Sequence, residues 1–86
     1  MQLDFTYLMS MLELIAEHKF PGHYSYVDTY IKSYYLPVES FESWIAEQLG
    51  RNVYSSKQIS NLISTVCVAD RKARVKLLAL LENKAS

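Results

Sequence analysis

The sequence predicts an all-α fold, a compact bundle of about five short helices in a single domain spanning residues 1–86. Apolar residues recur at spacings of three and four along most of the chain, which is typical of helices with one buried face. Residue types that start or stop helices interrupt this pattern, and no stretch shows the alternation and turn chemistry of a strand. With 86 residues, 50% of them hydrophobic, the chain has enough material for one core and not for two.

The first two helices are expected before residue 37. The first covers residues 3–19, where one face carries Phe5, Leu8, Leu12 and Ile15. Pro21 and Gly22 end it, because glycine readily adopts the left-handed conformation of a helix terminus. Ser25, three residues before Asp28, is a weak capping box that predicts the start of the second helix. The apolar stripe of that helix is Val27, Tyr30, Ile31 and Tyr34.

Three further helices are expected in the rest of the chain. Pro37 suits the first turn of the third helix, and Gly50 is expected to be its C-terminal cap. Ser55 and Gln58 form a capping box for the fourth helix, whose buried face is Ile59, Leu62, Ile63 and Val66. Asp70 is expected to cap a last helix over residues 71–84, with inward-facing Val75, Leu78 and Leu81.

Cysteine usage and hydropathy predict a cytoplasmic protein. Cys67 is the only cysteine, so no internal disulfide can form, which favours a reducing compartment. Acidic residues spread through the first 20 positions exclude the apolar core of a secretory signal. No run of 18 apolar residues occurs, so we expect no membrane-spanning helix.

Charge divides the chain into two halves although the formal net charge is zero. Residues 1–50 hold seven acids and two bases, whereas residues 51–86 hold seven bases and two acids. An acidic, tyrosine-rich half is therefore followed by a basic half. Such asymmetry indicates that the basic half meets an acidic partner, which leaves nucleic acid, an acidic protein or a second copy open. Chance together with helix-dipole preferences is the alternative explanation.

The residues that usually perform catalysis or bind metals are sparse. His18 and His23 are the only histidines, and their spacing across a Pro-Gly turn does not match a zinc site. Glu13 and Glu17 share one helical face, which a solvated surface explains. Cys67 follows the apolar residue Val66, as a buried free cysteine would. We therefore predict that the chain is not an enzyme and has no metal site, cofactor or small-molecule substrate.

A row of tyrosines is a candidate surface for binding another protein. Tyr26, Tyr30 and Tyr34 recur at intervals of four, so their rings form one ridge along the second helix. Tyrosine is enriched at interface hot spots because it buries a large area while its hydroxyl tolerates water. The alternative is a half-buried seam against a neighbouring helix, since Val27 and Ile31 also need covering.

Residues 44–63, WIAEQLGRNVYSSKQISNLI, contain the other candidate motif. In order, Ile45, Ala46, Leu49 and Gly50 place an apolar, a small, an apolar and a turn residue at fixed offsets. This segment resembles the helix-turn-helix of small bacterial and phage DNA-binding regulators. The resemblance implies a recognition helix with Ile59, Leu62 and Ile63 as its apolar anchors. Ile59 follows Gly50 by nine residues, three more than the usual turn of that family allows.

The resemblance and the basic last helix together predict a nucleic-acid surface. Polar residues of the fourth helix would approach a groove, and Asn61 would pair with adenine. The basic cluster of the last helix would neutralise phosphates, although a solvated basic face explains it equally well. The predicted nucleic-acid-binding residues are Ser56, Lys57, Ser60, Asn61, Arg71, Lys72, Arg74 and Lys76.

The sequence therefore favours a small non-enzymatic regulatory protein that binds DNA, with the tyrosine-rich half as a dimer or partner surface. The main alternative is a protein–protein interaction module, such as an adaptor, inhibitor or immunity-type protein, that does not bind nucleic acid. The near-neutral net charge favours this alternative, because many DNA-binding domains of this size are strongly basic. A subunit of an obligate helical complex is the third possibility.

Overall fold

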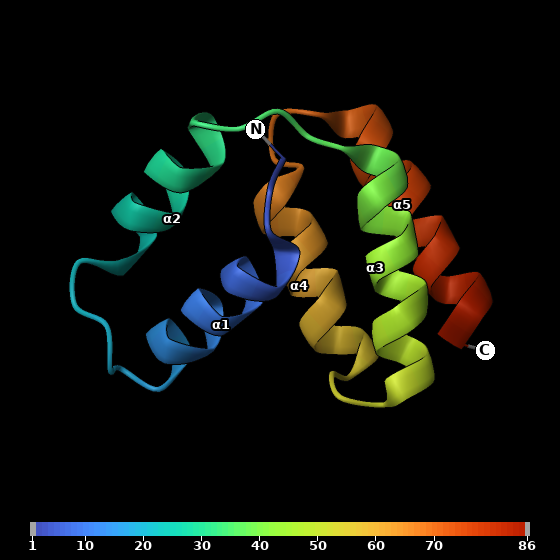
Figure 1. The fold of residues 1–86 in the computed structure, drawn as a ribbon, viewed down its shortest axis with the longest axis horizontal. Coiled ribbons are helices and arrows are strands. Elements are labelled where there is room, and N and C mark those ends of the chain that lie inside the picture. Colours follow the sequence, from blue (N-terminus) through green and yellow to red (C-terminus); the bar gives the residue numbers. More distant parts are fainter. Residues whose placement is uncertain (1, 86) are drawn as a thin grey trace. The chain divides into compact units, whose positions relative to one another are not determined.

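The computed structural model describes residues 2–85 and contains five helices (Figure 1). They are α1 (Phe5–Ala16), α2 (His23–Lys32), α3 (Val38–Arg51), α4 (Ser56–Val66) and α5 (Arg71–Ala85). Over these described residues the extended pairing is limited to an isolated bridge between Gln2 and Tyr35, and no strand forms. The prediction of an all-α fold with five helices is therefore confirmed.

The chain divides into two compact units at residue 37. The first unit, Met1–Pro37, contains α1 and α2, and the second, Val38–Ser86, contains α3, α4 and α5. This division differs from the charge boundary at residue 50, because α3 with its glutamates belongs to the second unit. That all 86 residues make a single domain stays a prediction.

Helix α1 begins at an unanticipated cap and ends earlier than predicted. The Tyr7 backbone N–H donates to Asp4 Oδ1 at 3.1 Å, which satisfies one of the open donors of the first turn. The helix ends at Ala16, before residue 19, and His18 takes a left-handed φ of 60° in the turn that follows. The buried face of α1 consists of Phe5, Leu8, Met9, Met11 and Ile15.

Helix α2 begins at a glycine turn, and the predicted Ser25–Asp28 capping box is wrong. Gly22 is the N-cap with a left-handed φ of 81°, so the helix starts at His23. Ser25 already lies inside the first turn, where its hydroxyl donates to the Gly22 carbonyl. Within α2, which is described throughout, Val27 alone is buried. Most of the surface of α2 is therefore left partly or fully exposed to solvent.

Helix α3 continues past the residue that was expected to end it. Gly50 lies inside the helix, which runs to Arg51, and the prediction of Gly50 as the C-terminal cap is wrong. Asn52 instead takes the left-handed conformation, with a φ of 57°. Asparagine tolerates this region better than most residues, because its short polar side chain hydrogen-bonds locally.

The starts of α4 and α5 were predicted correctly. The Ser55 N–H donates to Gln58 Oε1 at 2.8 Å and the Gln58 N–H donates to Ser55 Oγ at 3.2 Å, which completes the capping box. The Ala73 N–H donates to Asp70 Oδ1 at 3.0 Å, so Asp70 caps α5. Both helices therefore begin within a residue of the expected positions.

The rotation of α5 differs from the prediction, and this difference shapes the surface of the second unit. Ala73, Leu77 and Leu81 face the core, whereas Val75 is 59% exposed and Leu78 is half-buried. Helix α5 carries apolar residues on more than one face, so spacing alone did not select the face that packs. It packs against both α3 and α4. Fully buried side chains of this unit are Phe41, Ile45, Ile59, Leu62, Ile63, Cys67 and Leu77.

Candidate functional site

The tyrosine ridge of α2 lines a hollow between α1 and α2. Tyr26, Tyr30 and Tyr34 border this open cavity of about 610 Å³, together with Tyr7 and Met11 of α1. The Tyr30 and Tyr34 ring centroids are 4.6 Å apart, and those of Tyr7 and Tyr30 are 5.1 Å apart. These distances are in the range at which tilted aromatic rings attract each other. Tyr7, Tyr30 and Tyr34 therefore form one cluster of rings, and Tyr26 lines the same hollow beside Phe20, which gives the hollow its aromatic wall.

Tyr30 anchors this wall to the rest of the unit. Its hydroxyl oxygen accepts a hydrogen bond of 3.3 Å from the backbone N–H of Asp4. Burial raises the pKa of Tyr30, against the opposing effect of that backbone hydrogen bond. The half-buried Tyr30 therefore agrees with the alternative prediction, in which the tyrosines form a seam against a neighbouring helix. Its ring packs between those of Tyr7 and Tyr34.

Tyr26 is the exposed end of the same wall. Its side chain is 57% exposed and its ring centroid lies 5.3 Å from that of Phe20, edge to face. A Cβ placed on Gly22 would lie 3.2 Å from the Tyr26 ring, so the glycine turn leaves room for the ring. The Tyr26 ring is held by Phe20 and the turn, yet more than half of its surface meets solvent. Such a ring offers apolar area at low entropic cost to a partner.

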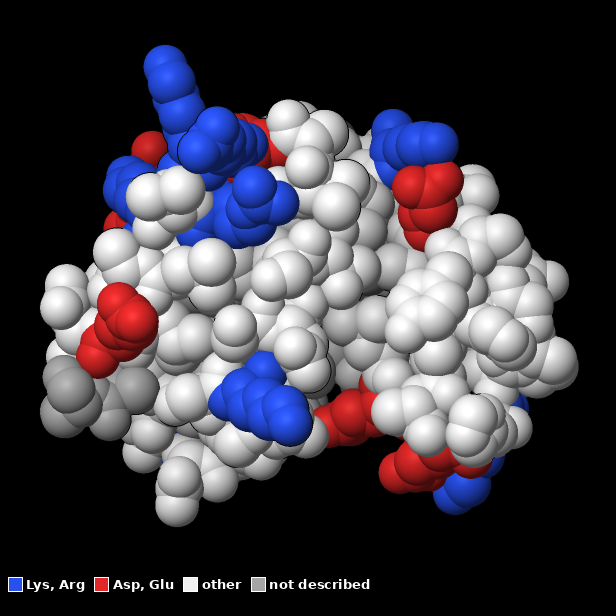
Figure 2. Space-filling view, turned by 180° about the vertical axis from the view of Figure 1, so that it is seen from behind, with Lys and Arg blue, Asp and Glu red and all other residues white. Residues whose placement is uncertain are grey.

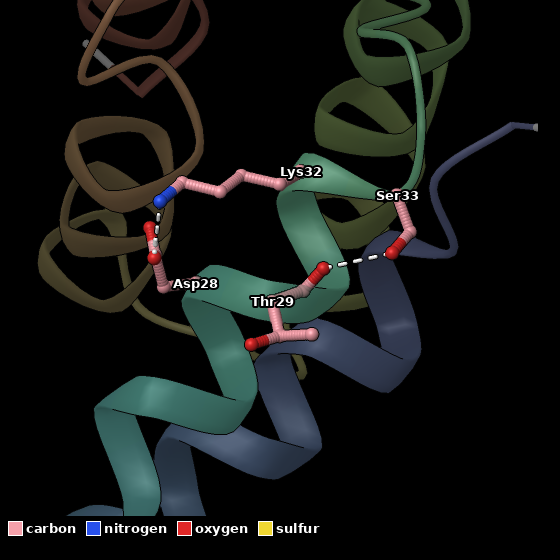
Figure 3. A network of polar contacts seen from close by, with 4 residues as sticks. All are labelled: Asp28, Thr29, Lys32 and Ser33. Carbon is pink, nitrogen blue, oxygen red and sulfur yellow. Dashed lines mark hydrogen bonds and ion pairs between the residues drawn. The ribbon is translucent and has the colours of Figure 1, made fainter.

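Polar residues of α2 and its C-cap form local contacts with one another (Figure 3). Lys32 Nζ and Asp28 Oδ2 form an ion pair of 2.8 Å, one turn apart on the helix. The Ser33 hydroxyl donates to the Thr29 carbonyl at 2.9 Å, and both residues also line the hollow. The hollow is therefore lined by the hydroxyl-bearing residues Thr29 and Ser33 beside the aromatic rings, whereas the ion pair of Asp28 and Lys32 does not line it.

The residues predicted to bind nucleic acid separate into several groups. Ser56, Lys57 and Ser60 lie in a groove between α4 and α5, while Asn61 is exposed and does not line it. On α5, Arg71, Lys72 and Lys76 surround the exposed Val75. Arg74 is only partly exposed and does not line this hollow. The eight predicted residues therefore do not all lie around one hollow.

Acidic residues of α3 reduce the basic character of the second unit. Glu42 Oε1 lies 2.8 Å from Lys76 Nζ, and Glu39 also acts electrostatically on Lys76. The unit as a whole has seven bases and five acids, because the glutamates of α3 accompany the basic α5. The strong charge division seen along the sequence is therefore much weaker between the two units.

The helix-turn-helix geometry is also not reproduced. In that motif the two helices pack on each other across a short turn. Here the main helix contacts of the second unit join α4 to α5 and α3 to α5. Ile45, Ile59 and Leu62 are fully buried, so the predicted anchors are core residues. A helical core alone explains the spacing of these residues, and the packing of α3 and α4 on α5 is what departs from the motif.

The side chains considered for chemistry do not assemble into a site. Among the described residues, no three His, Cys, Asp or Glu side chains lie close enough together to hold a metal ion. Cys67 is fully buried, and burial raises the pKa of its thiol to about 11, with Asp70 adding to the effect. Nor is any helix of the described residues long and apolar enough to cross a membrane. That the chain is not an enzyme stays a prediction.

Comparison with known proteins gives the family. Residues 1–82 match the family model described as Syndetin, C-terminal. The chain belongs to the Syndetin C-terminal family. It is 40% identical to Syndetin of Mus musculus over 85 residues, and 38% identical to Syndetin of Gallus gallus over 86 residues. These alignments cover 95% and 96% of the chain but only 8% and 9% of the two relatives. No solved structure matches the chain.

Family membership corrects the first interpretation of residues 44–63. The resemblance to helix-turn-helix regulators is wrong, because nearly the whole chain matches the Syndetin C-terminal family instead. The predictions of DNA binding and transcription regulation are wrong for the same reason. The alternative prediction, a protein–protein interaction module, fits the family better.

Proposed function

We propose that this chain is a protein-interaction module, and that its tyrosine surface binds another subunit or a client of a vesicle-tethering complex. The tyrosine surface is formed by Tyr7, Tyr26, Tyr30 and Tyr34. Membership of the Syndetin C-terminal family supports the assignment to such a complex. The chain spans less than a tenth of the length of its curated relatives, so it would act as one module within a longer protein.

The observation that carries the proposal is the exposure of Tyr26 beside a hollow with aromatic walls. Helix α2 buries only Val27, so most of its surface is left for a ligand. Half-buried Tyr30 and Tyr34 keep the wall in one conformation before a partner arrives, which lowers the entropic cost of binding. A partner would place an apolar side chain in the hollow and pair polar groups with the hydroxyls that line it.

Affinity purification with matched tyrosine variants tests this function. The tagged chain is expressed in cells, and co-purifying proteins are quantified for the wild type, Tyr26→Ala and Tyr24→Ala. Tyr24 is the control because it is 64% exposed on the same helix but does not line the hollow. Truncation of a hot-spot tyrosine weakens binding by about tenfold or more.

The expected result is a set of proteins lost with Tyr26→Ala and retained with Tyr24→Ala. Binding of the leading protein to the purified chain is then measured by calorimetry with the same variants. Thermal unfolding of both variants checks that the fold is intact. Equal recovery of every protein with the wild type and Tyr26→Ala would show that the tyrosine surface is not the binding site.

A further inference from the structure

Helix α5 has a second apolar stripe that the core does not use. Ala73, Leu77 and Leu81 fill the core, whereas Val75, Leu78 and Ala79 are spaced as neighbours on another face. Val75 is 59% exposed, Leu78 is partly exposed and Ala79 is exposed. A helix with two apolar faces in a small protein is unusual unless the second face meets a partner.

Helix α4 provides the opposite wall and turns this stripe into a groove. Ser56, Lys57 and Ser60 of α4 line a hollow of about 620 Å³ together with Val75, Leu78 and Ala79. The two helices pack against each other, so the groove follows their line of contact. Its floor is apolar and its α4 wall carries small hydroxyls, which leaves room for the side chains of another helix.

The two ends of the groove differ in charge. At the start of α5, Arg71, Lys72 and Lys76 surround Val75, which also belongs to the apolar floor. At the other end the groove is closed by Glu82. Figure 2 shows lysine and arginine side chains gathered over the start of α5, with uncharged surface beside them. The distance from Arg71 to Glu82 along the helix axis is roughly 16 Å, or about three turns.

The basic side chains at the start of α5 and at the start of α4 differ in whether they have an acidic partner among the described residues. Lys76 is paired with Glu42 at 2.8 Å. Among the described residues, Arg71, Lys72 and Lys57 form no ion pair. Lys57 in the groove, and Arg71 and Lys72 around Val75 beside it, are therefore cations left without an acidic partner among the described residues.

We propose that the groove between α4 and α5 binds an acidic amphipathic helix of a partner protein. Apolar side chains spaced one turn apart on that helix lie over Val75, Leu78 and Ala79. Its acidic residues meet Arg71 and Lys72 at one end and Lys57 on the flank, and a basic residue meets Glu82. This surface lies in the second unit and does not depend on the tyrosine surface of α2.

The composition of the groove argues against two other classes of ligand. Nucleic acid gains little from an apolar floor, and Glu82 would repel its phosphates. An anionic membrane is bound by apolar side chains that project from a surface, whereas Val75, Leu78 and Ala79 line a concave one. A narrow apolar groove with charged ends matches the way in which amphipathic helices are recognised.

Photo-crosslinking identifies the segment that lies in the groove. The photoreactive residue benzoylphenylalanine replaces Ala79 in the groove or, as a control, Val68, which is 74% exposed and does not line the groove. The chain is irradiated in cells and the cross-linked peptides are identified by mass spectrometry. The expected product joins position 79, and not position 68, to an acidic amphipathic segment of another protein. A cross-link to a second copy of the chain, or none specific to position 79, would overturn the proposal.

Binding of the captured segment, made as a labelled peptide, then tests the chemistry. Val75→Asp and the double variant Arg71→Glu with Lys72→Glu should each weaken binding at least tenfold, because one charges the floor and the other reverses the basic end. Val68→Asp should leave affinity unchanged. The double variant also suits the fold, since acids at the start of a helix favour its dipole. A peptide with lysines in place of its acids should recover binding to the double variant only.

Two further probes address the excluded ligands. The purified chain is mixed with phosphatidylserine vesicles or with a 20-base-pair DNA duplex at low salt. Binding to either probe that is lost with Val75→Asp would assign the groove to that ligand and overturn the proposal. We expect no such loss, because duplex DNA binds through the charges and the apolar residues of the groove line a concave surface that a membrane does not fit.

Discussion

Lys76 of α5 lies 2.8 Å from Glu42 of α3, and this ion pair joins two helices that also pack through apolar side chains. The hydrogen bond from Lys76 to Glu42 and the attraction between their charges raise the pKa of Lys76. Because Lys76 lines the hollow around Val75 together with Arg71 and Lys72, the pair removes one cation from the set available to a ligand there. The paired oxygen of Glu42 is buried while Lys76 is exposed, so solvent screens this pair only in part.

Replacing Glu42 with glutamine is expected to lower the pKa of Lys76 towards its ordinary value. The folded pKa is raised, so the pair's contribution to stability is complete below pH 10.5, the ordinary lysine value, and is lost as the pH rises through the folded pKa. The measurement is an NMR titration of the Lys76 side chain. Glu47→Gln is the control, because Glu47 pairs with Arg51 within α3 and not with Lys76. An unchanged Lys76 pKa in Glu42→Gln would show that the pair does not form in solution.

The two glycines are expected to respond in opposite directions to alanine. Gly22 has a φ of 81° and its added Cβ would lie 3.2 Å from the Tyr26 ring, so Gly22→Ala should destabilise the fold by roughly 1–2 kcal/mol. Gly50 is helical and nothing lies within 4 Å of its added Cβ. Gly50→Ala should therefore stabilise the fold by about 0.5–1 kcal/mol. Urea unfolding of both variants measures these changes, and destabilisation by Gly50→Ala would contradict the helix end at Arg51.

The fold could be predicted where local chemistry decides the structure. The capping residues Ser55, Gln58 and Asp70 act on the backbone within three positions, so the starts of α4 and α5 follow from sequence. The ends of helices were harder to place. Whether Gly50 or Asn52 takes the left-handed conformation depends on how far packing extends α3, and spacing does not report that.

The candidate sites were only partly visible in the sequence for a similar reason. The tyrosine ridge follows from a fixed interval of four within one helix, which is a local property. The groove depends on which face of α5 turns to the core, and its apolar residues occur on several faces. Val75 was therefore expected inside, and the groove between α4 and α5 was missed. The sequence does contain a second apolar stripe on α5, formed by Val75, Leu78 and Ala79, which indicates a candidate binding surface.

Loss of the capping box should destabilise α4 measurably. Ser55→Ala removes the acceptor for the Gln58 N–H and is expected to cost about 1 kcal/mol of unfolding free energy. Ser64→Ala is the matched control, because Ser64 is exposed in the middle of the same helix. Alanine favours helix there, so that variant should be neutral or slightly more stable. Equal midpoints of the two variants in urea would exclude a capping role for Ser55.

Native Cys67 should resist alkylation until the protein unfolds. Its thiol is buried and its pKa is raised to about 11, so at pH 8 only about one molecule in a thousand carries the reactive thiolate. We expect slow labelling by iodoacetamide in buffer and rapid labelling in urea above the unfolding midpoint, measured by mass spectrometry. Destabilisation by Ser55→Ala, a change in the same unit as Cys67, should speed labelling in buffer, because the thiol then becomes accessible through more frequent unfolding. Rapid labelling of the wild type in buffer would show that Cys67 is not enclosed by the core of the second unit.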